Sequence, residues 1–350
     1  MFQLKTKIVF GRESIKKLHL KGRKAAIFSS NSMIKYGFTQ EVADTIDMPY
    51  FIMKDIKSEP EEKDIEKYVE ILKREEPDAI IAIGGGSVID TAKASLYHYK
   101  KAKLVAIPST SGSGSEVTMA AVLAKNGVKY SLVADYIAPI IAILDSRLPE
   151  KMPAKLVAYT GMDALAHAIE SYVSNIASPF SQAFSIKAIK IIFENLLSSF
   201  NGSQKARETM HCASCMAGIA ILNARVGICH VMAHKMGIFK IPHGLAISFL
   251  LDETMKYNMK DEIAKKRYNK IAKELGLKNA HMLVEEIKRL KEKIGMKSIV
   301  SHIDENDFNN KLDLMAKEAA KDALLRFNPR KASMKEIKEI YGKAYYENNQ

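Results

Sequence analysis

The chain has 350 residues, of which 47% are hydrophobic and 27% charged, which is enough for two globular domains with substantial cores. Its formal net charge is +13, but the basic residues are spread through glutamate-rich helical segments, a pattern typical of a solvated surface rather than of a nucleic-acid-binding module. No apolar run reaches the roughly 20 residues of a membrane span, and no signal peptide is visible. We therefore expect a cytoplasmic protein with neither a nucleic-acid nor a membrane partner.

The first 150 residues alternate short apolar runs of strand length with segments of helical composition, such as 64–75. This alternation predicts βαβ units and therefore a mainly parallel sheet covered by helices, a Rossmann-like α/β domain. The segment 129–135 is predicted to add an edge hairpin. The runs predicted as strands are 24–30, 50–54, 79–84, 104–108 and 139–145.

Two glycine-rich or hydroxyl-rich loops follow predicted strands. In the first, Gly84-Gly85-Gly86-Ser87 precedes a predicted helix, which Ser87 can cap together with Asp90 three positions later. The second runs from Ser109 to Glu116. Glycines at a strand-to-helix turn let backbone N–H groups approach an anion at the positive end of the helix. Neither GxGxxG nor GxxxxGK[ST] is present, yet two such loops favour a nucleotide lying across the carboxyl ends of the strands.

The pattern changes after residue 145. Pro149 and Pro153 interrupt the chain, and from Ala154 onward helical periodicity dominates. We therefore place a domain boundary near residue 152, with an all-helical domain after it. Either Asp304 or Asn306 is predicted to cap a late helix.

Carboxylate and imidazole side chains recur at helical spacing in this second half. Asp163 and His167 are four residues apart, His230 and His234 repeat that spacing, and His243 follows. A single histidine is more often an ordinary core or surface residue, but four of the nine histidines fall in these apolar segments. One carboxylate with two or three imidazoles can bind a divalent transition metal and leave a position open for a substrate oxygen. Spacing alone would make His234 a ligand beside His230.

Four segments stand out in the chain, in this order: GGGSVIDTAK (84–93), PSTSGSGSEVT (108–118), GMDALAHAIESYVS (161–174) and HVMAHKMGIFKIPHG (230–244). Together they resemble the iron-containing, group III alcohol dehydrogenases. The resemblance extends from the first strand to about residue 260. It implies a metal-dependent, NAD(P)-linked alcohol dehydrogenase or aldehyde reductase that acts on a small alcohol or aldehyde and forms a homodimer or larger homo-oligomer. It also implies a dinucleotide-binding domain over 1–152 and a helical metal and substrate domain over 153–350.

The resemblance also assigns roles to individual residues. Asp163, His167, His230 and His243 correspond to the ligands of one metal ion, Fe²⁺ or Zn²⁺, whereas His234 corresponds to a histidine near the nicotinamide that can relay a proton. The segment between His230 and His243 is one residue shorter than the family pattern. Asp90 belongs to the glycine-loop motif, although helix capping alone could explain it. The positions implied to contact the cofactor are Gly85, Gly86, Ser87, Asp90, Ser109, Thr110, Ser113, Thr118, Lys129 and Leu148.

Cofactor choice is predicted from the end of the first strand of the sheet. Where Ser30 falls, NAD-preferring members of the resembled family commonly have an aspartate that binds the adenosine ribose. An acid there repels the 2′-phosphate of NADP, and a serine does not. We therefore expect NADP or NAD, with NADP favoured; the alternative is that Ser30 is merely a turn residue.

Two other enzyme classes share this architecture. One is a polyol dehydrogenase similar to glycerol dehydrogenase, and the other is a lyase similar to 3-dehydroquinate synthase, which also uses NAD and a metal. The intact Asp163 and His167 pair argues against the lyase.

Overall fold

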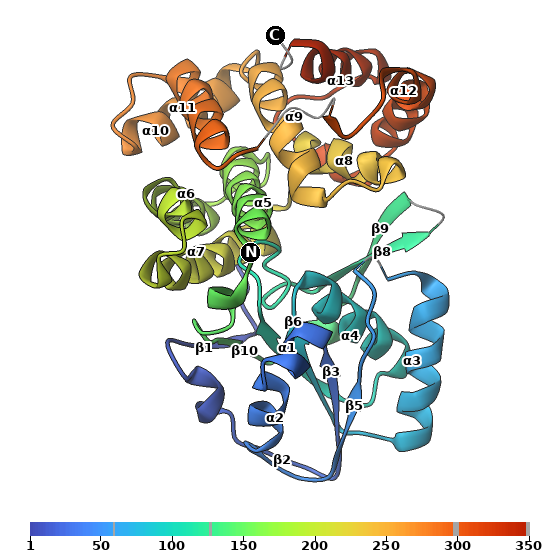
Figure 1. The fold of residues 1–350 in the computed structure, drawn as a ribbon. Coiled ribbons are helices and arrows are strands. Elements are labelled where there is room, and N and C mark those ends of the chain that lie inside the picture. The colour runs from blue at the N-terminus through green and yellow to red at the C-terminus, as the bar shows by residue number, and fades with distance from the viewer. Residues whose placement is uncertain (59, 126–127, 297–300, 348–350) are drawn as a thin grey trace.

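The computed structural model describes residues 1–58, 60–125, 128–296 and 301–347. An α/β region formed by the first part of the chain lies against an all-helical region formed by the rest (Figure 1). This two-part architecture is the predicted fold class.

The α/β region is built on a six-stranded sheet with the order β1-β10-β7-β6-β3-β5, in which every registered pair is parallel. Its central strands are buried on both faces, which explains why they read as continuous apolar runs. Each of the five predicted strands is present. The strands are β1 (Lys7–Phe10), β3 (Ala25–Ser29), β5 (Tyr50–Met53), β6 (Ala79–Gly84), β7 (Lys103–Pro108) and β10 (Ile141–Leu144).

Two hydrophobic clusters cover the two faces of this sheet. Ala26 and Phe28 belong to one cluster and Ala25 and Ile27 to the other, as the alternation of a strand requires. The first face is covered by α3 and α4, and the second by α1 and α2. The helices are α1 (Asn31–Lys35), α2 (Phe38–Ala43), α3 (Glu62–Glu75) and α4 (Gly86–Tyr99), and two short strands, β2 (Leu20–Lys21) and β4 (Ile46–Asp47), pair separately.

The predicted hairpin is present, but it is not an edge of the main sheet. β8 (Ala120–Lys125) and β9 (Val128–Val133) pair with each other as a separate antiparallel sheet. The prediction of an edge position was wrong because the hairpin packs on α4: Ala121 and Leu123 are buried in the same cluster as the apolar face of that helix. β9 also contacts α8, so the hairpin reaches the helical region.

The helical region surrounds α5, whose residues from Gly161 to Val173 are all buried. α6 and α7 pack on one side of it and α9 on another (Figure 1). Asp304 caps α12 by accepting hydrogen bonds from the N–H groups of Asn306 and Asp307, which confirms the first of the two predicted caps. The helices are α5 (Ala154–Val173), α6 (Pro179–Phe200), α7 (Gln204–Ala224), α8 (Ile228–Lys235), α9 (His243–Asn258), α10 (Glu262–Glu274), α11 (Ala280–Lys293), α12 (Glu305–Ala320) and α13 (Met334–Glu347), with short 3₁₀ helices that include η3 (Pro149–Lys151), η4 (Met236–Phe239) and η6 (Ala323–Phe327).

Only the short η3 lies between the last strand of the sheet and α5, and the domain boundary near residue 152 is our interpretation of this stretch.

In the described part of the chain, no single helix is long and apolar enough to cross a membrane. One helix pair, Gln204–Ala224 with Ile228–Phe239, passes the length and composition test together, but it is bent by 101°.

Candidate active site

A cavity of about 1330 Å³ is lined by residues of both regions. One wall consists of the loops that follow β6 and β7 together with the β8–β9 hairpin. The opposite wall consists of α5, α8, the start of α9 and the ends of α7 and η6. A crevice at the carboxyl ends of parallel strands is the usual ligand site of such a sheet.

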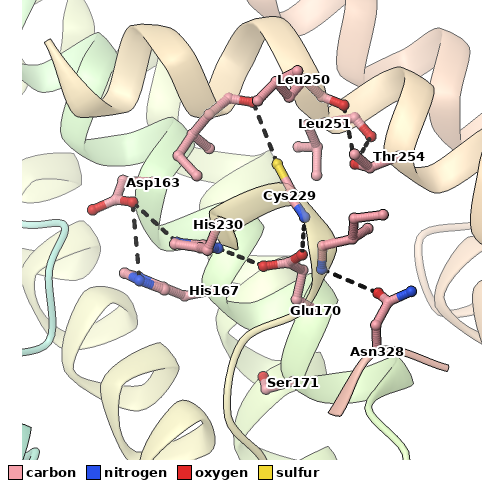
Figure 2. A network of polar contacts seen from close by, with 12 residues as sticks. Asp163, His167, Glu170, Ser171, Cys229, His230, Leu250, Leu251, Thr254 and Asn328 are labelled. Carbon is pink, nitrogen blue, oxygen red and sulfur yellow. Dashed lines mark hydrogen bonds and ion pairs between the residues drawn. The ribbon is translucent and has the colours of Figure 1, made fainter. Parts of the chain in front are cut away.

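The predicted metal ligands converge on the helical wall. The carboxylate Oδ1 of Asp163 lies 3.4 Å from Nε2 of His230, 3.5 Å from Nε2 of His243 and 3.9 Å from Nε2 of His167. One candidate ligand atom from each of Asp163, His167 and His230 lies within 4.8 Å of the others. Figure 2 shows these three side chains facing one another from α5 and α8. Residues up to 80 positions apart thus form one cluster.

Close packing at the start of α9 places the fourth side chain. His243 is the first residue of that helix, and a Cβ on the next residue, Gly244, would overlap the backbone carbonyl of Tyr159 on α5. A glycine is therefore required for α9 to approach α5 this closely. The one-residue shortening between His230 and His243 does not prevent His243 from reaching Asp163.

The cluster fits a divalent cation. Oδ1 of Asp163 and Nε2 of His230 are buried and have no hydrogen-bond partner, although buried polar atoms are normally paired. Nδ1 of His167 lies 3.3 Å from the carbonyl oxygen of Gly112, so the N–H of this ring is directed away from the cluster and Nε2 toward it. A carboxylate oxygen and imidazole nitrogens suit both Fe²⁺ and Zn²⁺.

Burial and the charges of neighbouring groups shift the pKa values of Asp163 and the histidines. Burial raises the pKa of Asp163, but the neighbouring imidazoles, His167 first, outweigh it and hold the pKa of this carboxyl far below its usual range. Burial lowers the pKa of His167 to about 4 and that of His243 to about 3, so both rings are neutral at neutral pH and offer lone pairs. For His230 burial acts in the same direction, but the charge of Glu170 outweighs it and raises the pKa to about 9.

Glu170 is a site residue that the sequence analysis missed. Its Oε2 is hydrogen-bonded to Nδ1 of His230, while its Oε1 accepts a hydrogen bond of 2.7 Å from the backbone N–H of Cys229 (Figure 2). A carboxylate behind a histidine fixes the ring and makes its other nitrogen a stronger ligand. Its spacing in the sequence could have identified it, because Glu170 follows Asp163 by seven residues and His167 by three, on the same helix face.

The other wall gathers most, but not all, of the predicted cofactor positions. Ser109 and Leu148 are buried and do not line the cavity; Leu148 packs in the sheet core, and the N–H of Ser109 donates a 2.8 Å hydrogen bond to the carbonyl of Gly84. Ser30 does not line the cavity either. Those that do are Gly85, Gly86, Ser87, Asp90, Thr110, Ser113, Thr118 and Lys129.

The two predicted loops lie against each other. A Cβ on Gly86 would lie 2.9 Å from Oγ of Ser113, and one on Gly85 would lie 3.4 Å from Cγ2 of Thr110. A side chain at Gly86 would therefore force the Ser113 side chain to move. The glycines bring the two loops to one side of the cavity next to the N-terminus of α4, where an anion is favoured.

The predicted capping box of α4 was wrong. The helix begins at Gly86 with Gly85 as its N-cap, and the Ser87 hydroxyl donates to the carbonyl of Ser58. Asp90 instead accepts hydrogen bonds from the Ser115 hydroxyl at 2.5 Å and from the N–H of Val122 at 3.2 Å. Its carboxylate joins α4 to the hydroxyl-rich loop and the hairpin, contacts too distant in sequence for a local capping rule to predict.

Comparisons with known proteins identify the family of this chain. The model of the iron-containing alcohol dehydrogenases matches residues 5–146, and the model of the C-terminal region of the same family matches residues 157–345. The chain belongs to the iron-containing alcohol dehydrogenase family. This membership confirms the predicted family and a metal-containing alcohol dehydrogenase, and it favours the dehydrogenase over the lyase alternative.

Full-length relatives support the same conclusion. An alcohol dehydrogenase of Thermococcus barophilus is 41% identical over 99% of this chain and 99% of that protein. An NADPH-dependent butanol dehydrogenase of Clostridium saccharobutylicum is 39% identical over 99% of this chain and 98% of that protein. The solved structure of an iron-containing alcohol dehydrogenase from Thermococcus thioreducens superimposes with a TM-score of 0.95 at 40% identity, covering 99% of both chains.

In this alcohol dehydrogenase, His234 differs from the other three histidines. It lies one turn beyond His230 on α8, lines the cavity, and stacks on His243 with ring centroids 5.2 Å apart. Among the described residues, no ion pair joins His234 to Asp163. Burial, reinforced by His243, lowers the pKa of His234 well below its usual value, so the ring is neutral at neutral pH.

A second unpredicted residue supports the cofactor wall of the dehydrogenase. Lys93 is completely buried, and its Nζ donates to Oγ of Ser115 at 3.0 Å, to Oγ1 of Thr118 at 3.1 Å and to the carbonyl of Ala120 at 2.9 Å. Burial lowers the pKa of Lys93 to about 8. The sequence reads this lysine as part of an ordinary helix, because its partners lie beyond the next strand.

Ser30 caps a helix. Its hydroxyl accepts a 3.4 Å hydrogen bond from the N–H of Met33 at the start of α1. A carboxylate is also close by, since Asn31 donates a 3.3 Å hydrogen bond to Asp55, which follows β5. The end of β3 thus has no acid of its own, but the neighbouring strand supplies one.

Proposed function

We propose that the enzyme interconverts small alcohols and aldehydes or ketones, using NADP(H) at least as well as NAD(H). Asp163, His167, His230 and His243 would bind one Fe²⁺ or Zn²⁺, and His234 would exchange the substrate proton. The observation that carries this proposal is the convergence of three imidazoles on one buried carboxylate oxygen, across a cavity from two anion-binding loops. We also propose a homodimer or larger homo-oligomer in the cytoplasm.

A divalent ion in this cluster would supply Lewis acidity, lowering the pKa of an alcohol as it lowers that of water. The chain supplies the rest. Glu170 orients His230, and the carbonyl of Gly112 orients His167, so that both rings direct Nε2 at one point. His234 lines the same cavity and its ring stacks on that of His243, so it is placed to receive the alcohol proton during oxidation and return it during reduction.

The cofactor would lie on the opposite wall. Gly85 and Gly86 leave the N-terminus of α4 open to the pyrophosphate, and Thr110 and Ser113 line the cavity beside them. This arrangement would let the nicotinamide end reach toward the histidine cluster, because one continuous cavity contacts both walls. The preference for NADP is supported by Ser30 and by the relative from Clostridium saccharobutylicum that is named NADPH-dependent.

The test is an anaerobic, metal-supplemented assay of primary and secondary alcohols and of aldehydes with both cofactors, followed by nicotinamide absorbance. Polyols are included because of the glycerol dehydrogenase alternative. We expect turnover of at least one alcohol–aldehyde pair, with kcat/KM for NADP(H) equal to or above that for NAD(H). Absence of turnover across the panel by protein that has bound stoichiometric metal would contradict the proposed function.

Size-exclusion chromatography with light scattering tests the proposed homo-oligomer, and cell fractionation tests the proposed cytoplasmic location.

A further inference from the structure

Part of the cavity is lined by a cationic and apolar patch that the proposed reaction does not use. It lies where α7 ends and along η6, on the same wall as the histidine cluster. Two arginines stand among aliphatic and aromatic side chains there. We call this set the arginine patch: Arg225, Arg326, Ile221, Leu222, Val226, Leu324 and Phe327.

Arg225 occupies an unusual position. Its φ of 63° lies in the left-handed region that residues with side chains rarely adopt, so the backbone is strained where this side chain enters the cavity. The residue is only partly exposed. In the part of the chain that the structure describes, no carboxylate or other acceptor pairs with its guanidinium. A partly buried cation without a partner is costly, and strain of this kind concentrates at binding sites.

Arg326, on η6, adds a second positive charge to the arginine patch. Its guanidinium lies 4.7 Å from the ring centroid of Phe327, while burial and the charge of Arg326 both lower the pKa of Arg225. η6 is tied to α8 because Asp322 caps η6 and forms a 2.8 Å ion pair with Lys235. Two like charges held side by side lower each other's stability unless an anion lies between them.

The acidic residues that line the cavity are engaged elsewhere. Glu61 pairs with Lys63 at 2.7 Å, Asp90 is bonded to Ser115 and Val122, and Asp163 faces the histidines. None of them is within ion-pair distance of Arg225 among the described contacts. Among the described residues that line the cavity, no carboxylate is therefore left to pair with the arginine patch, and a ligand can supply the anion.

The dinucleotide is the less suitable source of that anion. The glycine loop and the N-terminus of α4, on the α/β wall, would already hold its pyrophosphate. Arg225 instead belongs to the wall of the metal cluster: it lies two residues before Gly227, the N-cap of the helix that carries His230 and His234. Apolar side chains between charged groups suit a short carbon chain with an acidic end.

We propose that Arg225, with Arg326 beside it, binds an acidic group at the far end of the substrate, so that the preferred substrates are aldehydes and alcohols bearing a carboxylate or phosphate. The proposal rests on the dehydrogenase function above and deepens it. A guanidinium binds a carboxylate or phosphate through two parallel hydrogen bonds. The acidic group does not react: hydride from the reduced nicotinamide goes to the carbonyl carbon, a proton goes to the oxygen, and the alcohol and oxidised cofactor leave.

The kinetic test compares aldehydes of equal chain length with and without an acidic end: 4-oxobutanoate against butanal, and 6-oxohexanoate against hexanal. For the metal-loaded wild type we expect kcat/KM for the oxoacid to exceed that for the neutral aldehyde by about tenfold or more at one length at least. Arg225→Gln should remove this advantage through KM and leave the neutral aldehyde and the KM for NADPH within about twofold. Arg225→Lys should retain part of it, and Arg289→Gln on the distant, exposed face of α11 should retain all of it.

Binding provides a readout independent of turnover. In calorimetry on the metal-loaded enzyme–NADPH complex, 4-hydroxybutanoate should bind more tightly than butan-1-ol, and Arg225→Gln should abolish the difference. If Gln is not tolerated at this backbone conformation, Arg225→Gly, which suits a positive φ, replaces it. Selective binding without turnover of any aldehyde would support the anion site and overturn only the reaction. A wild type without preference for the acids in either assay, or a variant in which the KM for NADPH rises instead, would overturn the assignment.

Discussion

The two walls of the cavity present different kinds of ligand-binding group. The helical wall presents charged side chains that are held in place by other buried side chains, as Glu170 holds His230. The α/β wall presents backbone N–H groups and hydroxyls, made accessible by glycines that leave no room for side chains. The first kind of wall is recognisable from residue types at helical spacing, whereas the second depends on how separate loops meet.

Each wall also contains a buried cluster of charges, and the two clusters differ in one respect. At Asp163 and His230, polar atoms that face the cavity have no hydrogen-bond partner. At Lys93 and Asp90, the charged atoms are bonded to hydroxyl and backbone groups within the protein. We propose that the first cluster binds a ligand and that the second stabilises the structure around one. The following variants test that division.

Removal of a metal ligand should have the largest effect. We expect His243→Ala to lose both the metal and turnover, because Nε2 of His243 is one of the nitrogens around Asp163. His234→Ala should keep the metal and lose about 10²–10⁴-fold in kcat, as expected for an acid–base group. Metal content after anaerobic reconstitution, measured by mass spectrometry, and turnover are compared. Equal loss of metal in the two variants would contradict the assignment of His234 as a non-ligand.

Lys93→Met tests the supporting cluster. The change removes a buried cation and leaves the buried Glu116 and the half-buried Asp90 beside an apolar side chain, so we expect a loss of roughly 3 kcal/mol or more in the free energy of unfolding. The KM for the cofactor should also rise, because Ser115 and Thr118 lose a common donor. Urea denaturation measures the stability. Lys205→Met, at a side chain that is 83% exposed, is the control and should change little.

Glu170→Gln should have a smaller effect on the metal site than ligand removal. The amide can accept a hydrogen bond from one of its present partners but not from both, so His230 is held less firmly. Loss of such an outer partner typically lowers metal affinity or activity by about 10–100-fold. Metal affinity is measured by competition with a chelator, and Glu194→Gln at an exposed site on α6 is the control. An unchanged affinity in Glu170→Gln would show that the carboxylate has only a packing role.

The same division explains which features the sequence predicted. Strand runs, the glycine loops and the Asp163–His167 spacing follow from local periodicity, and the structure contains all of them. The role of Asp90, the position of the hairpin and the burial of Lys93 depend on contacts between residues 22 to 32 positions apart, which local rules do not contain. Spacing alone would also make His234 a ligand, whereas the family resemblance predicts that it is not one.

Cofactor choice should show the smallest of these effects. Ser30→Asp places a carboxylate at the end of β3, where it would repel a 2′-phosphate, while aspartate can still cap α1 as Ser30 does. We expect the ratio of kcat/KM values to shift toward NAD by roughly tenfold, about 1.4 kcal/mol. Asp55→Asn provides the opposite change, because it removes the carboxylate that the neighbouring strand brings to Asn31, and it should shift the ratio toward NADP. Both are measured with one alcohol and saturating metal. If the wild type strongly prefers NAD and neither substitution moves the ratio, Ser30 acts only as the cap of α1 and specificity is determined elsewhere.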